Sequence, residues 1–171
     1  MSQALLAAEY RVPKREISAE ATFLGHPRKV VHLFLSERAQ THDGAERLSD
    51  LLNGTGDFLP AIEPPRNLVL LHKDALMALS VAVETEFPSQ EAAQEELAGT
   101  VGTSVVVGIA LRDGTEIGGT VRFVMPEGKN RLVDFLNEPE LFFAVRDGEL
   151  AHLVNKRCIV RVSVVGQEPG R

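Results

Sequence analysis

Short apolar runs separated by turn-forming residues fill most of the chain, and the second half shows this pattern most clearly. A β-branched run at 105–111 precedes Asp113-Gly114, a strong hairpin signal because both turn positions tolerate positive φ. The Gly118-Gly119 pair in the returning run indicates a bulge or a sharp bend. The pattern predicts five strands, at 105–111, 116–124, 141–145, 149–154 and 158–165.

One helical segment interrupts these strands. Leu132, Phe135 and Leu136 are spaced i, i+3, i+4, which gives a helix one apolar face. Pro139 prevents the helix from continuing. The order predicted for this half is two strands, a helix of one or two turns, and three strands.

The same pattern occurs twice. RLSDLLN at 47–53 matches RLVDFLN at 131–137, and Phe58-Leu59 falls on Phe142-Phe143 at the same offset. Three further segments match: 31–37 with 121–127, 70–76 with 153–159, and 80–81 with 163–164. The first copy has about six extra residues, near 38–43. These matches, which keep the same order in both copies, predict an internal duplication.

The duplication predicts the domain organisation. Pro88 is expected to break the strand before the linker, and Ser89 to cap a short acidic helix within it. The expected segments are an N-terminal arm at 1–15, a first repeat at 16–84, an acidic linker or linker helix at 85–102, a second repeat at 103–166 and a tail at 167–171.

The order of elements resembles that of small barrels of the Sm or SH3-like kind. The second repeat, with its R-L-x-D-F-L-N segment and its later V-N-K-x-x-I segment, resembles an uncharacterised bacterial small β-barrel family. The first repeat departs from that pattern, because His72 replaces Asn and Pro60 interrupts the third strand. The resemblance implies a mainly β (α+β) chain of two tandem barrels, each with a short helical insert, packed as a pseudo-two-fold pair. It implies no activity.

Composition narrows the function classes. The net charge of −6 is unlike the basic surplus that a general nucleic-acid binder uses against phosphates. Cys158 is the single cysteine, which excludes an internal disulfide and favours a buried apolar role. No apolar run approaches the roughly 20 residues that span a bilayer. We therefore expect a cytoplasmic protein without cofactors.

Candidate chemistry is sparse. His72 and His152 fall near matching strands and could approach at a domain seam, where they would bind a metal or simply be hydrogen-bonded. Matched polar pairs such as Asp50 and Asp134 admit an acid–base reading. Structural roles explain these matched residues better. The two aspartates form ion pairs with Arg47 and Arg131 on their helices. The matched asparagines, Asn53 and Asn137, end those helices in the left-handed conformation.

The sequence thus predicts a non-enzymatic adaptor or regulatory protein that binds another protein through edge strands. The alternative is an RNA- or nucleotide-binding small barrel, whose binding would be salt-sensitive and whose basic face would be Arg28, Lys29, Lys156 and Arg157. An enzyme would need Asp50, Asp134, His72 and His152 in one cleft. The possible interaction surface comprises Arg11, Lys14, Arg15, Arg28, Lys29, Lys73, Lys156 and Arg157.

Overall fold

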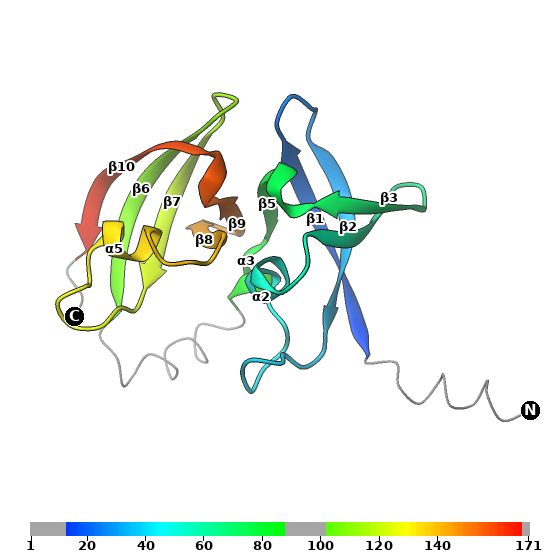
Figure 1. Ribbon diagram of the computed structural model, residues 1–171, viewed down its shortest axis with the longest axis horizontal. Coiled ribbons are helices and arrows are strands. Elements are labelled where there is room, and N and C mark those ends of the chain that lie inside the picture. The colour runs from blue at the N-terminus through cyan, green and yellow to red at the C-terminus, as the bar shows by residue number, and fades with distance from the viewer. Residues whose placement is uncertain (1–12, 88–101, 169–171) are drawn as a thin grey trace, which may run out of the picture.

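Most of the chain is β-structure. The structure is a computed structural model that describes residues 13–87 and 102–168. Within those ranges, ten strands form one antiparallel sheet accompanied by three short α-helices (Figure 1). The predicted mainly β fold is confirmed. The sheet is not closed, so the predicted pair of separate barrels is not confirmed. Among the described residues, no helix has both the length and the apolar character needed to cross a membrane.

The first half, residues 13–87, begins with a long hairpin. Alternation along its second strand places Val31, Leu33 and Leu35 on the buried face. The elements are β1 (Lys14–Phe23), β2 (Lys29–Ser36), α2 (Leu48–Asn53), β3 (Phe58–Glu63), β4 (Asn67–His72), the 3-10 helix η1 (Lys73–Ala75), β5 (Leu76–Ala82) and α3 (Val83–Glu86).

The second half, residues 102–168, repeats the succession of strands and inserts. The predicted hairpin is confirmed, because Gly114 has a φ of 86° and Asp113 accepts hydrogen bonds from the amide and the hydroxyl of Thr115. The elements are β6 (Thr103–Leu111), β7 (Glu116–Phe123), α5 (Leu132–Leu136), β8 (Phe142–Asp147), β9 (Leu150–Asn155), the 3-10 helix η2 (Lys156–Cys158) and β10 (Ile159–Glu168).

The two halves join within the sheet. The strand order is β10-β6-β7-β8-β9-β5-β1-β2-β3-β4, so each half contributes five neighbouring strands (Figure 1). Strand β5 pairs with β9, with Ala78 opposite Val154 and Ala82 opposite Leu150. We call this pairing the seam. We call β4 and β10, which end the sheet within the described residues, the outer edges.

The seam differs from the expected pseudo-two-fold arrangement. A two-fold axis brings equivalent strands together, such as β5 with β10. The seam instead joins the fifth strand of the first half to the fourth strand of the second. This pairing satisfies the backbone of both strands and buries Leu79 against Leu153. The halves are therefore arranged head to tail.

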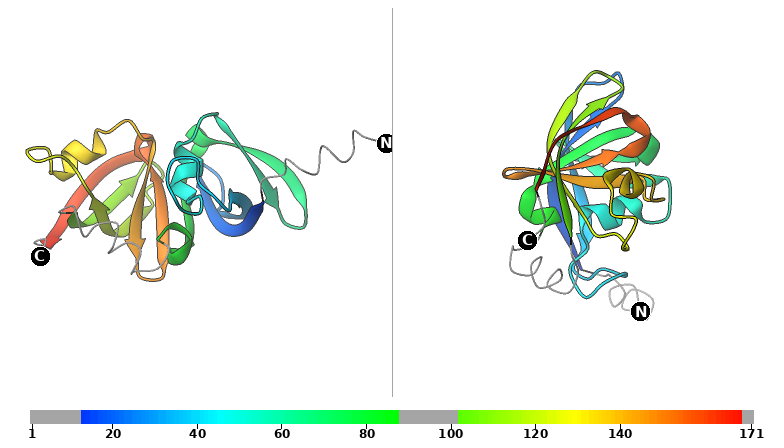
Figure 2. Two further views of the ribbon diagram at one scale, coloured as in Figure 1. Left: turned by 90° about the horizontal axis from the view of Figure 1, so that it is seen from below. Right: turned by 90° about the vertical axis from the view of Figure 1, so that its left-hand side faces the viewer.

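The strands of each half curl around a centre of their own (Figure 2). Each centre holds a hydrophobic core that includes side chains from the other half. The first core includes Phe142, Ala151 and Leu153, which come from the second half. The second core includes Met77 and Ala78, which come from the first half. The seam is thus a shared part of two cores rather than a contact between two finished surfaces.

Several predicted boundaries were wrong. Strand β1 begins at Lys14, so Lys14 and Arg15 belong to the sheet rather than to an N-terminal arm. The strand before the linker ends at Ala82, where α3 begins, and Pro88 is not what ends it. Arg11 and the rest of the arm, the linker from Pro88 to Val101 and the last three residues of the tail lie outside the described residues.

Proline and glycine also act differently from the prediction. Pro60 does not interrupt β3, which runs through it opposite Leu70. Strands β2 and β3 pair at Ile62, so the missing amide of Pro60 removes no ladder bond on that side. The pairing of β6 with β7 passes Gly118 and Gly119 without a bulge. A Cβ at Gly119 would lie 2.4 Å from the carbonyl oxygen of Arg146, so this glycine permits close approach of β8.

Candidate interaction surface

Asn53, the last residue of α2, forms the most specific polar contact of the seam. Its Nδ2 donates to the carbonyl oxygen of Phe142 at 2.9 Å, and its Oδ1 accepts from the amide of Phe142 at 2.9 Å. One side-chain amide therefore satisfies both backbone groups of one residue at the start of β8. The left-handed cap predicted for these asparagines was wrong for Asn137, which has a φ of −88°.

Asn155 links η2 to the strand across the seam. It is fully buried, its Oδ1 accepts from the amide of Arg157 at 2.9 Å, and its Nδ2 donates to the carbonyl of Leu76 at 2.8 Å. His72 occupies the matching cap of η1, where its Nδ1 accepts from the amide of Asp74 at 3.2 Å. The two residues cap their 3-10 helices alike, and Asn155 in addition fastens the seam.

Titratable groups also cross the seam. Arg157 pairs with Asp74 at 2.8 Å, and Nδ1 of His152 lies 2.8 Å from the hydroxyl of Ser80. Burial lowers the pKa of His152, although nearby Asp147 acts in the opposite direction. These contacts place a histidine and an exposed ion pair along one line of contact between the halves.

Glu86 is a buried acid in α3. Its carboxylate accepts a hydrogen bond from the amide of Ser49 at 3.0 Å, at the start of α2. Burial raises the pKa of Glu86, and the hydrogen bonds with Ser49 only partly offset that effect. Glu86 therefore ties α3 to α2, and its charged form is disfavoured there.

The outer edges differ from the seam in exposing apolar side chains. Strand β4 exposes Leu68 and Leu70, and β10 exposes Val160, Val164 and Val165. Within the described ranges neither strand has a second strand neighbour. An unpaired edge with exposed apolar side chains is a template for another strand. These edges are the candidate functional site.

Three of the predicted basic residues are paired with acids. Arg28 lies 3.2 Å from Glu20, Lys29 lies 3.2 Å from Glu63, and Arg157 pairs with Asp74 as described. Lys14 and Arg15 are exposed on β1. The predicted site residues therefore do not form a purely cationic face, which is the feature that would favour RNA.

Lys73 and Lys156 have a structural role. Lys73 is buried and its Nζ donates to the carbonyl of Gly54, at the end of α2, at 2.8 Å. Lys156 donates to the carbonyl of Glu138, just beyond α5, at 2.8 Å. Burial lowers the pKa of both ammonium groups. Each lysine closes the end of its own helix, so Lys73 in particular is not available on a partner surface.

The residues that could have formed a metal or catalytic site are dispersed. His72 contacts the ring of Phe58 and the amide of Asp74, whereas His152 contacts Ser80 and Asp147, so the structure does not bring the two histidines into one site. Asp50 accepts from the amide of Arg47, and Asp134 pairs with Arg131, each within its own helix. Among the described residues, no group of three or more His, Cys, Asp or Glu side chains could hold a metal ion.

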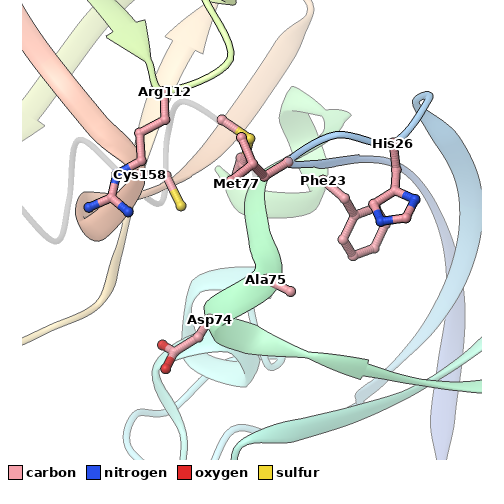
Figure 3. Close-up of a pocket in the computed structure, with 8 residues that line it drawn as sticks. Phe23, His26, Asp74, Ala75, Met77, Arg112 and Cys158 are labelled. Atoms are coloured by element: carbon pink, nitrogen blue, oxygen red, sulfur yellow. The ribbon is translucent and has the colours of Figure 1, made fainter.

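A cavity of about 290 Å³ lies where the two halves meet (Figure 3). Its lining includes Cys158 and Arg112 from the second half and Met77, Asp74 and His26 from the first. Burial raises the pKa of the Cys158 thiol, which disfavours the thiolate that a nucleophile requires. The cavity is therefore a surface hollow beside the seam, lined in part by exposed residues such as His26 and Arg112, and its thiol is not activated.

Comparison with protein-family models, curated proteins and solved structures finds no match for this chain. The resemblance to a small-barrel family stays a prediction.

Proposed function

We propose that this chain is a protein-interaction protein, an adaptor or regulator, that binds its partner by strand addition at the outer edges. The observation that carries the proposal is the exposure of Leu68 and Leu70 on β4 and of Val160 and Val164 on β10. Strand addition satisfies the unpaired backbone of such an edge, and pockets for alternate side chains provide specificity.

The proposal includes an internal duplication, in which each half is one copy of a small domain. Both halves follow the same succession of strands and inserts. The helices α2 and α5 begin with the same capping arrangement, from Arg47 to Asp50 and from Arg131 to Asp134. Both 3-10 helices are capped by the side chain of the preceding residue. Equivalent polar residues thus have equivalent local roles.

A protein partner fits the charge of the surface better than a nucleic acid does. The net charge is −6, and cations such as Arg28 and Lys29 face carboxylates at short distance. Phosphate binding would have to break those pairs. The single, buried Cys158 suits a reducing compartment, and we propose the cytoplasm.

The test compares tagged full-length chain with edge variants as bait in lysate of the native host. Leu70→Lys on β4 and Val164→Lys on β10 place a charge on each outer edge without disturbing a buried residue. Leu24→Lys, in the exposed β1–β2 turn, is the matched control. We expect near-stoichiometric capture of a protein by the wild type and the control, and loss of that protein with an edge variant.

Cross-links from the captured protein should map to β4 or β10. Capture that is equally strong with both edge variants would contradict the proposal, and so would the absence of any captured protein at stoichiometric yield. Binding of single-stranded RNA at low salt, unaffected by the edge variants, would favour the alternative.

A further inference from the structure

We infer that the partner at the outer edges is a second copy of this chain, with β10 of one copy pairing with β4 of the next. The inference rests on the proposed function and specifies its partner. The seam joins β5, the fifth strand of the first half, to β9, the fourth strand of the second half. The two outer edges are the strands left over, which are β10, the fifth strand of the second half, and β4, the fourth strand of the first half.

Local geometry establishes which residues of the outer edges correspond to which residues of the seam. Strands β5 and β10 both start after a 3-10 helix and both carry a bulge at their second residue, Met77 and Val160. His72 and Asn155 end β4 and β9 as the caps of those 3-10 helices. Counting back from these caps, Leu70 corresponds to Leu153 and Leu68 to Ala151.

The fourth-strand side shows large differences in exposure at corresponding positions. Leu153 and Ala151 are 0% exposed because they enter the first core, whereas Leu70 is 65% and Leu68 is 69% exposed. Phe142 beside them is 2% exposed and its counterpart Phe58 is 57% exposed. Each of the three exposed side chains is as apolar as the buried residue that it matches.

The fifth-strand side shows the same difference. Met77 and Val81 are 1% and 2% exposed, whereas Val160 and Val164 are 68% and 59% exposed. Val164 lies opposite Val107 of the second core. The second core is therefore open where the first core receives Phe142, Ala151 and Leu153. The side chains that would close it are Phe58, Leu68 and Leu70 of another copy.

The seam also defines a register for the junction between copies. Leu79 faces Leu153 and Val81 faces Ala151 across the seam. The corresponding pairs between copies are Val162 with Leu70 and Val164 with Leu68. Both pairs are aliphatic, and pairs of this kind on one face of an antiparallel ladder stabilise it.

Polar groups of the seam have counterparts as well. Asn137, the counterpart of Asn53, is exposed and would bond the backbone of Phe58 in the next copy as Asn53 bonds Phe142. In His72, Nδ1 accepts a hydrogen bond, which places the ring proton on Nε2. That N–H can donate across the junction as Asn155 Nδ2 does at the seam.

Charge weakens the pairing at two positions. The groups that the junction between copies would bring together, Arg157 of one copy and Asp74 of the next, are each already engaged in the Arg157–Asp74 pair of their own seam. Arg161 of β10 corresponds to the buried Ala78 of β5 at the seam. A charge at an edge discourages pairing. The junction between copies is therefore weaker than the seam, and assembly is reversible.

The decisive experiment mixes two variants that are each blocked at one edge. Analytical ultracentrifugation should show concentration-dependent assembly of the wild type and of Leu24→Lys. It should show single chains for Leu70→Lys and for Val164→Lys. A mixture of the two blocked variants should form a one-to-one dimer, because each supplies the intact edge that the other lacks. Arg161→Ala should assemble at lower concentration than the wild type.

A cross-link tests the register. In a Cys158→Ser background, Leu68→Cys mixed with Val164→Cys should form an intermolecular disulfide under mild oxidation, because paired residues of adjacent strands lie within disulfide range. Leu68→Cys mixed with Val160→Cys is the control, since that pair is offset by several residues and should not cross-link.

The inference is overturned if the purified wild type remains a single chain at every concentration, or if either blocked variant alone still dimerises. The second result would show that like edges pair with each other. Failure of the inference is distinguishable from failure of the proposed function. If the wild type stays a single chain but captures a different protein through β4 or β10, the function stands and the second copy is excluded.

Discussion

At the seam, Leu153 of β9 lies within the first core, whereas at the outer edge the corresponding residue of β4, Leu70, faces solvent. The two residues have the same type, the same place in their strand and the same distance from a 3-10 cap. What differs is whether a fifth strand lies alongside. Burial at these positions is therefore a property of strand pairing and cannot be read from one half alone.

The largest effect should come from truncating the two leucines. Leu153→Ala removes a fully buried side chain from a shared core and should destabilise the chain by about 2–5 kcal/mol. Leu70→Ala removes an exposed side chain, and at a dilution where the chain is single it should change stability by less than about 0.5 kcal/mol. Urea unfolding followed by circular dichroism measures both. Equal costs for the two changes would remove the distinction between seam and edge.

The second effect compares the two helix-end asparagines. Asn53→Ala removes both hydrogen bonds to Phe142 and should cost about 1–2 kcal/mol, because the backbone groups of a buried residue lose their partners. Asn137→Ala should cost less than about 0.5 kcal/mol in the single chain, where that side chain is exposed. The same urea measurement applies. A large cost for Asn137→Ala would show that it has an equivalent contact without a second copy.

Much of the sheet could be predicted from local pattern. The Asp113-Gly114 turn, the β-branched run before it and the helical spacing of Leu132, Phe135 and Leu136 depend on neighbours in sequence, and the structure confirms them. The repeated segments place Lys73 and Lys156 at matching positions, and the structure gives the two lysines alike bonds to helix ends in place of the predicted interaction surface.

The seam could not be predicted, because it depends on contacts between residues far apart in sequence. Nothing in the local pattern distinguishes a fifth strand that pairs with its own equivalent from one that pairs with β9. The expected meeting of His72 and His152 failed for that reason, since it assumed a two-fold axis. Glu86 and Asn53 show their roles only once α2, α3 and β8 are packed together.

The third effect tests the seam by pH. Burial favours neutral His152 in the folded chain and lowers its pKa below 6.5. The contribution of His152 to stability is therefore constant above that pH and falls as the pH drops from 6.5 through the folded-state pKa, because the unfolded chain takes up the proton first. Thermal unfolding from pH 7.5 to 5 should show this loss in the wild type.

His152→Gln, which keeps a hydrogen-bond acceptor for Ser80, should show a smaller loss over the same range. His26→Gln, in an exposed turn, is the control and should follow the wild type. The seam would not be the source of the acid sensitivity if both variants lost stability as the wild type does.

The smallest effect concerns Glu86, which holds α3 beside the seam. Its raised pKa means that the folded chain favours the protonated carboxyl, so stability falls as the pH rises from 4.5 through the folded-state pKa. Glu86→Gln is neutral at every pH and its carbonyl can still accept from Ser49. The variant should therefore raise the Tm at pH 7.5 by about 1–2 °C, and the gain should disappear below pH 4.5.

Glu84→Gln changes an exposed acid of the same helix and should leave the Tm unchanged. A gain that persisted at acid pH would have to come from packing, because at that pH the wild-type carboxyl is already neutral.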